Sequence, residues 1–367
     1  MTSVDLGLPA VRPAERERGA VDAADERFRS GPLRDRHGRT ARDLRVSLTD
    51  RCNLRCHYCM PPEGLPWLER PAVLEDAEVV RLVTLAVREL GVHEVRFTGG
   101  EPLLRRGLED VVAATAALRT PAGERVRTSL TTNGVGLARR AAGLAAAGLD
   151  RVNVSLDTLR PERFAAITRR DRHADVLAGA RAAADAGLAP VKVNAVLLRG
   201  TNDDEAVPLL RWALREGYRL RFIEQMPLDP HGTWQRSDMV TADEILTALR
   251  AGFELTPRPG SARGSAPAET WDVTDTDGRT GDVGVIASVT RPFCGDCDRT
   301  RLTADGQVRT CLFSTTETDL RDAMRAGASD GELAATWRAA MWGKLPGHDV
   351  DDPAFLHPTR PMSSIGG

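Results

Sequence analysis

Six short runs of β-branched and apolar residues alternate with longer segments of helical period, and this alternation limits the fold more than any other feature of the chain. The expected helices lie near 75–90, 105–118, 137–147, 161–186 and 203–216, and glycines end several of them. Repeated strand–helix units predict a parallel sheet whose apolar faces are covered by helices. The expected strands are 44–48, 94–98, 127–131, 151–156, 191–198 and 220–225.

Such a sheet is either doubly wound or curled into a barrel. A doubly wound sheet that binds a dinucleotide would carry a GxGxxG turn after its first strand, and a cysteine-rich loop stands there instead. Polar or special residues follow nearly every strand, and in a barrel these strand ends converge on one mouth. They are Thr49, Thr98, Thr131, Ser155 and Met226. We therefore expect an α/β fold in the form of an incomplete barrel of six strand–helix units.

Changes in composition divide the chain into four expected parts. Residues 1–42 mix acids and bases with few large apolar groups, which predicts a mostly disordered leader. Residues 43–255 form the barrel. A linker rich in Pro, Gly and Ser opens a C-terminal subdomain, 256–345, which contains further strand-like runs and then helical sequence. The tail, 346–367, ends in two glycines.

Charge and length exclude several classes of protein. The 367 residues carry 50 Lys and Arg against 52 Asp and Glu, so we expect no general attraction to nucleic acid or to an anionic membrane. Apolar runs fall short of the ~20 residues of a membrane span. The leader has neither an apolar signal segment nor the acid-poor composition of a transit peptide, so we expect a cytoplasmic protein. In that compartment the six cysteines are better explained as metal ligands or catalytic thiols than as disulfides.

The cysteines fall into two triplets rather than into pairs or quartets. Three thiolates leave a bound metal centre with an open position, which suits a reactive centre better than a structural one. A zinc knuckle completed by His57 or by a remote ligand is the alternative for the first triplet. The triplets are Cys52, Cys56 and Cys59, after the first strand, and Cys294, Cys297 and Cys311, in the C-terminal subdomain.

The first triplet, with Tyr58 beside its third cysteine, resembles the signature of the radical S-adenosylmethionine (SAM) enzymes. RFTGGEP, at the end of the second strand, resembles the motif in which that family's backbone and an acid hold the SAM amino group. The second triplet narrows the resemblance to the MoaA family, the GTP 3′,8-cyclases. This likeness runs from about residue 43 to 367 through RDLRVSLTDRCNLRCHYCMP, LTTNG, RVNVSLD, VKVNAVLLRGTND, RFIEQMP and FCGDCDRTRL.

The resemblance implies two 4Fe-4S clusters, one on each triplet, with SAM on the open iron of the first and the guanine ring facing that of the second. It implies a lyase of molybdenum cofactor biosynthesis, in which reductive cleavage of SAM gives a 5′-deoxyadenosyl radical that takes the ribose 3′ hydrogen of GTP before the ribose carbon attacks C8 of guanine. Implied SAM contacts are Tyr58, Gly100, Ser155 and Met226. Implied GTP contacts are Arg45, which also counts as catalytic, Arg96, Thr131, Lys192, Arg299, Thr300 and Arg301.

The chemistry of GTP supports these cations independently, because a triphosphate carries about four negative charges and needs several donors. Asn133 and Asp157 are instead interpreted as strand-end caps or turn formers. A terminal Gly-Gly is usually a frayed end, but the family's tail reaches into the barrel beside GTP. Only glycine is thin enough to enter a mouth that also holds the triphosphate, SAM and two clusters, so Gly366 and Gly367 join the expected catalytic residues.

Two other interpretations stay open from the sequence. A different radical SAM enzyme, acting on a peptide, usually carries more downstream cysteines than this chain has. A non-catalytic metal sensor would have no need for the glycine-rich motif or for the Arg299 and Arg301 pair. The expected partners are GTP, a low-potential electron donor and the next enzyme of the molybdenum cofactor pathway as product acceptor. The sequence leaves a homodimer open.

Overall fold

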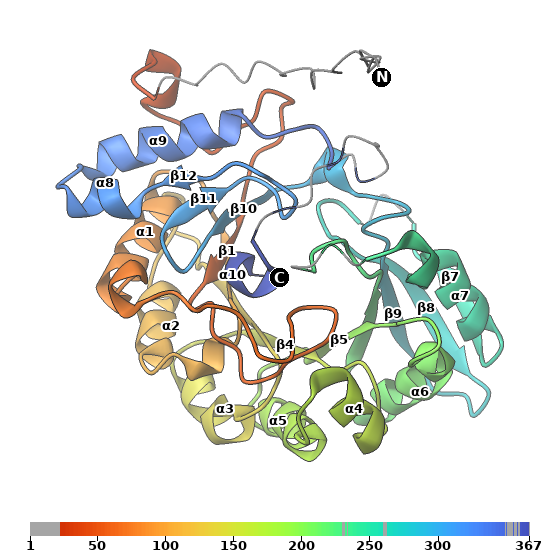
Figure 1. Ribbon diagram of the computed structural model, residues 1–367. Helices are drawn as coiled ribbons and strands as arrows, with labels where there is room; N and C mark the ends of the chain where they lie inside the picture. Colours follow the sequence, from red (N-terminus) through yellow and green to blue (C-terminus); the bar gives the residue numbers. More distant parts are fainter. Residues whose placement is uncertain are drawn as a thin grey trace, which may run out of the picture.

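The computed structural model describes residues 23–229, 232, 234–259, 263–348, 350, 355, 358 and 360–366. Its centre is a row of parallel strands that pair in chain order, with helices on the outside (Figure 1). The strands are β1 (Asp43–Ser47), β2 (Glu94–Thr98), β3 (Arg127–Thr132), β4 (Arg151–Ser155), β5 (Lys192–Val196) and β6 (Arg219–Ile223). The helices between and after them are α1 (Asp76–Arg88), α2 (Leu108–Ala116), α3 (Leu137–Ala146), α4 (Pro161–Thr168), α5 (His173–Asp185) and α6 (Ala206–Glu216). The predicted α/β fold of six strand–helix units is confirmed.

Strands from the C-terminal part of the chain extend this row at both ends. They are β9 (Thr280–Ile286), parallel to β6, and β10 (Arg299–Leu302), parallel to β1. Antiparallel strands complete the edges: β7 (Phe253–Pro257) and β8 (Glu269–Asp275) beyond β9, and β11 (Gln307–Arg309) and β12 (Thr318–Asp319) beyond β10. The strand order runs from β12 to β7 without a pairing between these two, so the barrel is open. Strands on both sides of residue 256 share this sheet, and the division into four parts stays a prediction.

The parallel strands present mostly apolar side chains outward and mostly polar side chains inward. In β1, Leu44 and Val46 are fully buried in the apolar core, which also contains Leu82 of α1. Their neighbours Arg45 and Ser47 alternate with them and face the interior of the barrel. The apolar core therefore lies between the sheet and its helices, and the inside of the barrel is polar.

The single helix expected over 161–186 is two helices, because α4 ends at Thr168 and α5 begins at His173. Arg169 between them has φ 55°, the left-handed conformation that ends a helix. This corner contains no glycine, so the usual stop signal is missing from the sequence. The described helices outside the barrel units are α7 (Ala242–Arg250), α8 (Arg321–Arg325), α9 (Asp330–Trp342) and α10 (Met362–Ile365). None of the described helices has the length and apolarity needed to cross a membrane.

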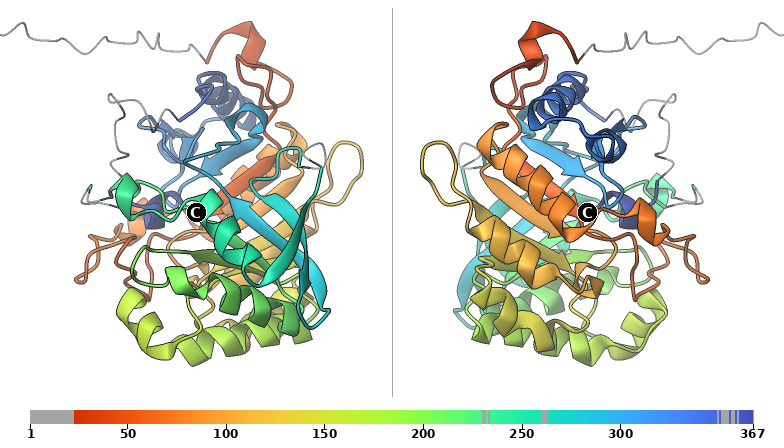
Figure 2. Two further views of the ribbon diagram at one scale, coloured as in Figure 1. Left: turned by 90° about the vertical axis from the view of Figure 1, so that its right-hand side faces the viewer. Right: turned by 90° about the vertical axis from the view of Figure 1, so that its left-hand side faces the viewer.

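Within the expected leader, residues 23–42 are described by the structure and are packed against the rest of the protein. They lie along α9, beside β10–β12 (Figures 1 and 2). Phe28 is buried, and its ring meets Trp342 edge-on with centroids 6.3 Å apart. Arg338 of α9 donates hydrogen bonds to the carbonyls of Phe28 (3.0 Å) and Gly31 (2.7 Å). These tertiary contacts hold a segment that composition alone predicted to be disordered; the rest of the expected leader lies outside the described residues.

Candidate active site

Cations from neighbouring strands line up across the barrel interior. Arg45 of β1 lies opposite Arg96 of β2 and opposite Arg301 of β10. In β5 and β6, Lys192 lies opposite Arg219. Because strand side chains alternate, residues opposite one another share a face of the sheet. The inside of a parallel barrel is usually filled by Val, Ile and Leu, so a polar interior indicates a binding chamber instead of a packed core.

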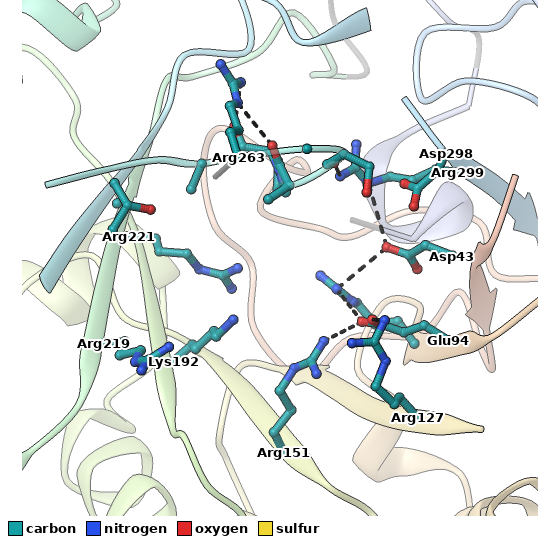
Figure 3. Close-up of a pocket in the computed structure, with 18 of the residues that line it drawn as sticks. Asp43, Glu94, Arg127, Arg151, Lys192, Arg219, Arg221, Arg263, Asp298 and Arg299 are labelled. Atoms are coloured by element: carbon teal, nitrogen blue, oxygen red, sulfur yellow. Dashed lines mark hydrogen bonds and ion pairs between the residues drawn. The ribbon is translucent and has the colours of Figure 1, made fainter. Parts of the chain in front are cut away.

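A cavity of about 530 Å³ opens at one end of this interior (Figure 3). Lys192 and Arg151 point into it from neighbouring strands, across from Asp43 and Arg299 (Figure 3). The charged residues that line it are Asp43, Glu94, Asp282 and Asp298 against Arg42, Arg96, Arg127, Arg151, Lys192, Arg219, Arg221, Arg258, Arg263 and Arg299. The volume suits a small ligand, and the excess of cations favours a polyanion.

The position of the cavity differs from the single mouth that we expected. Asp43, Glu94, Arg151 and Lys192 are the first residues of their strands, whereas the cysteine loop follows the last residue of β1. The basic cavity and the first cysteine triplet therefore lie at opposite ends of the barrel interior. A strand of five residues separates these ends by about 16 Å. A ligand that uses both ends must extend along the barrel.

Burial, and then crowded positive charge, lowers the pKa of two cations in the interior. Burial, followed by the nearby Arg221 and Arg151, lowers the pKa of Lys192 to about 8. Burial and then Arg96 lower the pKa of Arg221 to about 9. The buried Nε atoms of Arg45 and Arg96 have no hydrogen-bond partner within the described part of the protein. Buried polar groups are normally paired, so an anionic ligand would both accept these bonds and relieve the repulsion.

Arg221 and Thr131 belong to one hydrogen-bonded network on the chamber wall. Arg221 donates to Oδ1 of Asn194 at 3.0 Å and to Oδ1 of Asn153 at 2.9 Å. Asn153 donates in turn to Thr131 Oγ1 at 3.1 Å. Arg221 was not predicted as a site residue from the sequence. Arg219 and Arg221 are two residues apart in one strand, and this spacing indicates that both face the same side of the sheet.

At the other end of the strands, the glycine-rich motif packs against the cysteine loop. Gly100 N donates to the Thr49 carbonyl and Glu101 N to the Arg51 carbonyl, both at 2.7 Å. A Cβ atom at position 100 would collide with the Arg51 carbonyl oxygen. Glycine alone permits this approach, so the motif fixes the segment that leads into Cys52.

Glu101 is completely buried and joins the ends of β2 and β3. Its carboxylate accepts hydrogen bonds from Leu103 N (2.9 Å), Thr132 Oγ1 (2.7 Å) and Asn133 N (2.7 Å). Burial raises the pKa of Glu101 to about 7 in spite of these donors. Asn133 also donates to Asn53 Oδ1 of the cysteine loop at 2.7 Å. The acid of the motif is thus engaged by protein donors and holds the loop that surrounds the site.

Tyr58 and Asp157 connect the cysteine loop to the ends of β4 and β5. Tyr58 Oη donates to Asp157 Oδ2 at 2.7 Å, and Asp157 Oδ1 accepts from Val196 N at 2.9 Å. Burial raises the pKa of Asp157 to about 6. Asp157 therefore acts as the strand-end cap that we interpreted it to be and also positions Tyr58. Ser155 ends β4 and Met226 follows β6, both partly buried at this end of the barrel.

The first triplet brings three free thiols together in one loop. Burial, and then the neighbouring Cys52, raises the pKa of Cys59 to about 12. Burial and then Cys59 raise the pKa of Cys56 well above its usual value. This mutual influence identifies a shared neighbourhood, in which a bound cationic centre would favour the thiolates. Within the described residues, no group of three or more His, Cys, Asp or Glu side chains is arranged around a single metal ion.

The second triplet lies beside β10 among cations. Cys294 and Cys297 flank a short 3₁₀ turn, and Cys311 follows β11. Lys344 Nζ is 3.3 Å from Cys297 Sγ, and Arg299 Nη1 is 3.9 Å from it. Burial raises the pKa of the Cys297 thiol, but Lys344 and Arg299 more than offset this, so the pKa lies below its usual value. Burial raises the pKa of Cys294 to about 11.

Arg301 connects the second triplet to the C-terminal tail. Its Nη1 atom donates to the Gly366 carbonyl. α10 carries Gly366 into the space between Ser47 and Thr98, at the ends of β1 and β2. Figure 1 shows α10 inside the ring of strands and helices. Gly367 lies outside the described residues.

Thr300 faces away from the chamber, unlike its neighbours in β10. It is fully buried, and its hydroxyl accepts a hydrogen bond from Trp337 Nε1 of α9 at 3.0 Å. Alternate residues of a strand face opposite sides, so Arg299 and Arg301 face inward while Thr300 faces the helix. A GTP contact by Thr300 stays a prediction, and with this orientation of the side chain it would come from the backbone of the residue.

Comparisons with known proteins identify the family. Residues 46–213 match the Radical SAM superfamily, and residues 218–350 match Molybdenum Cofactor Synthesis C. A GTP 3′,8-cyclase of Streptomyces coelicolor is 64% identical over 335 residues, 91% of this chain and 96% of that protein. A GTP 3′,8-cyclase of Mycobacterium marinum is 59% identical over 368 residues, 100% of both chains. The chain belongs to the GTP 3′,8-cyclase family.

Membership of the GTP 3′,8-cyclase family favours an enzyme over a metal sensor, and a nucleotide substrate over a peptide. Among solved structures, Streptococcus suis SuiB bound to S-adenosylmethionine aligns with a TM-score of 0.54 at 14% identity, over 80% of this chain and 66% of that chain. At this identity the likeness concerns the fold alone. Radical SAM enzymes use SAM with an iron–sulfur cluster, and the soft thiolates of both triplets are suitable cluster ligands. These cofactors account for all six cysteines.

Proposed function

We propose that this protein converts GTP to (8S)-3′,8-cyclo-7,8-dihydroguanosine 5′-triphosphate, an early step of molybdenum cofactor biosynthesis. The observation that carries the proposal is one polar chamber with cations and the second cysteine triplet at one end and the first cysteine triplet at the other. A triphosphate suits the cations, and the nucleoside then extends toward the thiols. A low-potential electron donor, and the next enzyme of the pathway as product acceptor, belong to the same proposal.

The cysteine triplets would each hold one 4Fe-4S cluster, and Tyr58, Gly100, Ser155 and Met226 would surround SAM. When bound, the first cluster and SAM supply the one-electron chemistry that removes a hydrogen atom from the ribose of GTP. The protein's own contribution is to position the two reactants and to exclude water, because the cofactors carry the difficult chemistry. The proposed GTP contacts are those expected from the sequence, Arg45, Arg96, Thr131, Lys192, Arg299, Thr300 and Arg301, together with Arg221.

The cations at the basic end of the chamber bind the phosphates of GTP. Lys192 and Arg221, on neighbouring strands at the basic end, neutralise the phosphates, while the network through Asn153 and Asn194 fixes the Arg221 guanidinium. A positioned guanidinium binds phosphate oxygens with good geometry and at little entropic cost. Fixing the phosphates also fixes how far the ribose reaches toward the cysteine loop.

Replacing Arg221 by Met is expected to weaken GTP binding about 10- to 100-fold, because a hydrogen bond to a charged group contributes about 1.5–3 kcal/mol and about 1.4 kcal/mol is a factor of ten. Titration calorimetry with GTP measures this change, and the iron content should stay normal. Arg88→Met, on the exposed end of α1, is the control for loss of one positive charge. Equal affinities for Arg221→Met and the control would remove Arg221 from the site.

We expect GTP binding to weaken as the pH rises through about 8. The pKa of Lys192 is about 8 in the free protein, and a bound triphosphate would raise it. Binding above that pH must therefore take up a proton, whereas below it the proton is already present. Calorimetry in two buffers of different ionisation enthalpy measures the uptake. Lys192→Arg keeps its charge throughout this range, so proton uptake near pH 8 should disappear; an unchanged uptake would assign the effect to another group.

Anaerobic incubation of the reconstituted protein with GTP, SAM and dithionite tests the function directly. We expect 5′-deoxyadenosine and the cyclised nucleotide to form together, in proportion to GTP consumed. Formation of 5′-deoxyadenosine with no cyclised nucleotide would contradict the proposed reaction while leaving radical SAM chemistry intact.

A further inference from the structure

Lys344 is a buried ammonium group beside the second cysteine triplet. The residue is 3% exposed, and within the described part of the chain Nζ forms no ion pair with a carboxylate. Nζ instead donates to the Arg299 carbonyl at 2.7 Å, and lies 3.4 Å from the Cys297 carbonyl and 3.3 Å from Cys297 Sγ. An ammonium group has three donors, and these three acceptors account for all of them. A buried charge needs compensation, and a thiolate at Cys297 supplies it.

Arg39 holds the segment that carries Lys344. Its Nη1 donates to the Cys294 carbonyl at 2.6 Å and to the Pro346 carbonyl at 3.1 Å, and its Nη2 donates to the Leu345 carbonyl at 2.6 Å. One guanidinium therefore joins the cysteine turn to the residues that follow Lys344. Arg39 belongs to the N-terminal segment that composition predicted to be disordered.

Asp35 fixes Arg39 from within the same segment. The Asp35 carboxylate is almost completely buried, 2.5 Å from Arg39 Nε, and accepts backbone hydrogen bonds from His37 and Arg39. A backbone bridge between Arg34 and Thr40 closes the loop around this pair. Asp35 therefore positions Arg39, Arg39 positions residues 344–346, and Lys344 in turn contacts the Cys297 sulfur.

We propose that Lys344, held by Arg39, is a positioning residue that donates to the Cys297 sulfur of the second iron–sulfur cluster and raises the reduction potential of that cluster. The inference rests on the proposed function, because it needs a cluster on the second triplet. A reduced cluster carries one more negative charge than an oxidised cluster, so a fixed ammonium group and an N–H···S hydrogen bond stabilise the reduced form. Loss of the ammonium group makes the cluster harder to reduce.

The choice of side chain agrees with this role. The chain contains only two lysines, Lys192 and Lys344, and uses arginine for all its other basic side chains. A guanidinium spreads its donors over a planar fork, whereas an ammonium group directs three donors from one point. At position 344 the three acceptors converge on one point, which favours lysine.

The test measures the second cluster alone, in a full-length chain whose Cys52, Cys56 and Cys59 are replaced by alanine. This chain should retain about four irons after reconstitution. An EPR-monitored redox titration then compares it with the same chain carrying Lys344→Met or Lys344→Arg. We expect the midpoint potential to fall in the Lys344→Met protein and to fall less in the Lys344→Arg protein, which keeps the positive charge but not the donor geometry of lysine. The same potential in all three proteins would overturn the proposal.

A second arm tests the N-terminal support. Arg39→Met should lower the potential in the same direction as Lys344→Met, and the double variant should show little further shift, since one residue acts through the other. Arg34→Met removes an exposed charge from the same segment and should leave the potential unchanged. If the Arg39→Met and Lys344→Met shifts in midpoint potential add in the double variant, Arg39 does not act through Lys344 and this part of the proposal is contradicted.

Iron analysis shows whether each variant still assembles its clusters. If Lys344→Met prevents assembly of the second cluster, the otherwise natural chain should still hold about four irons on the first triplet, which supports a structural form of the same role. If the parent chain without the first triplet holds no iron, the second cluster and with it the proposed function fail, not the assignment of Lys344 alone.

Discussion

Replacing Cys52, Cys56 and Cys59 together by alanine is expected to halve the iron content, from about eight to about four per chain, and to abolish SAM cleavage completely. The reason is that each triplet is local: the three first-triplet thiols share one loop after β1, and those of the second surround β10 and β11. Removing one set of ligands leaves the other set intact. Iron analysis and assay of 5′-deoxyadenosine after anaerobic reconstitution measure both effects.

The complementary variant provides the control. Replacing Cys294, Cys297 and Cys311 by alanine should also leave about four irons, but dithionite should still drive SAM cleavage, because the first cluster is untouched. Conversion of GTP should be lost in both proteins. One equivalent of zinc in the natural protein, in place of iron, would instead support the zinc knuckle and contradict a cluster on the first triplet.

The strands of the barrel were predictable because their apolar runs are short, regular and separated by helical sequence. β2 begins and ends where the sequence predicted, at 94 and 98, and the other five differ by a few residues at most. The outward-facing residues, such as Leu44 and Val46, pack under the helices and give each strand its apolar signal. The cysteine triplets were predictable for a different reason, because their spacing depends on local chain geometry alone.

The basic chamber was harder to predict because it depends on which side of each strand faces inward. Arg45, Arg96 and Lys192 were named as GTP contacts from their motifs. Arg221 and Arg151 open the quoted motifs RFIEQMP and RVNVSLD but were not named as contacts, although both line the cavity. Their convergence on one cavity follows from the curvature of the sheet into an open barrel, a long-range property that no single motif contains. The same alternation turns Thr300 outward, between two inward-facing arginines.

The N-terminal segment shows the limit of composition as evidence. Residues 23–42 have few apolar groups, yet hydrogen bonds join them to distant parts of the chain. Arg338 donates to two carbonyls of this segment, and Arg39 of the segment donates to the carbonyl of Cys294. Hydrogen bonds of this kind come from partners about 300 residues away along the sequence, so composition within the segment does not reveal them.

Removing Gly366 and Gly367 is expected to leave iron content and SAM binding near normal while stopping GTP conversion. Gly366 supplies the carbonyl that accepts from Arg301, a buried cation, and removal of that acceptor leaves the guanidinium free to move. A hydrogen bond to a charged group contributes about 1.5–3 kcal/mol, and because its loss leaves Arg301 poorly positioned we expect the rate to fall by at least about tenfold. Product formation at saturating GTP measures the loss. A truncated protein that forms the cyclised nucleotide at the full rate would reduce the tail to a frayed end.

A point substitution separates the position of the tail from its length. Gly366 has φ +81°, and a Cβ atom there would collide with Ser47 Oγ and lie 2.6 Å from Thr98 Cγ2. Gly366→Ala should therefore push the tail out of the barrel and reproduce much of the truncation. Gly327→Ala is the matched control, because Gly327 has φ +95° but open space around it, so it carries backbone strain without a collision. Because most of the phosphate-binding cations lie at the other end of the chamber and only Arg301 is held by the tail, both tail variants should lower kcat much more than they weaken GTP binding. An equal loss of affinity would make the tail part of the binding site instead.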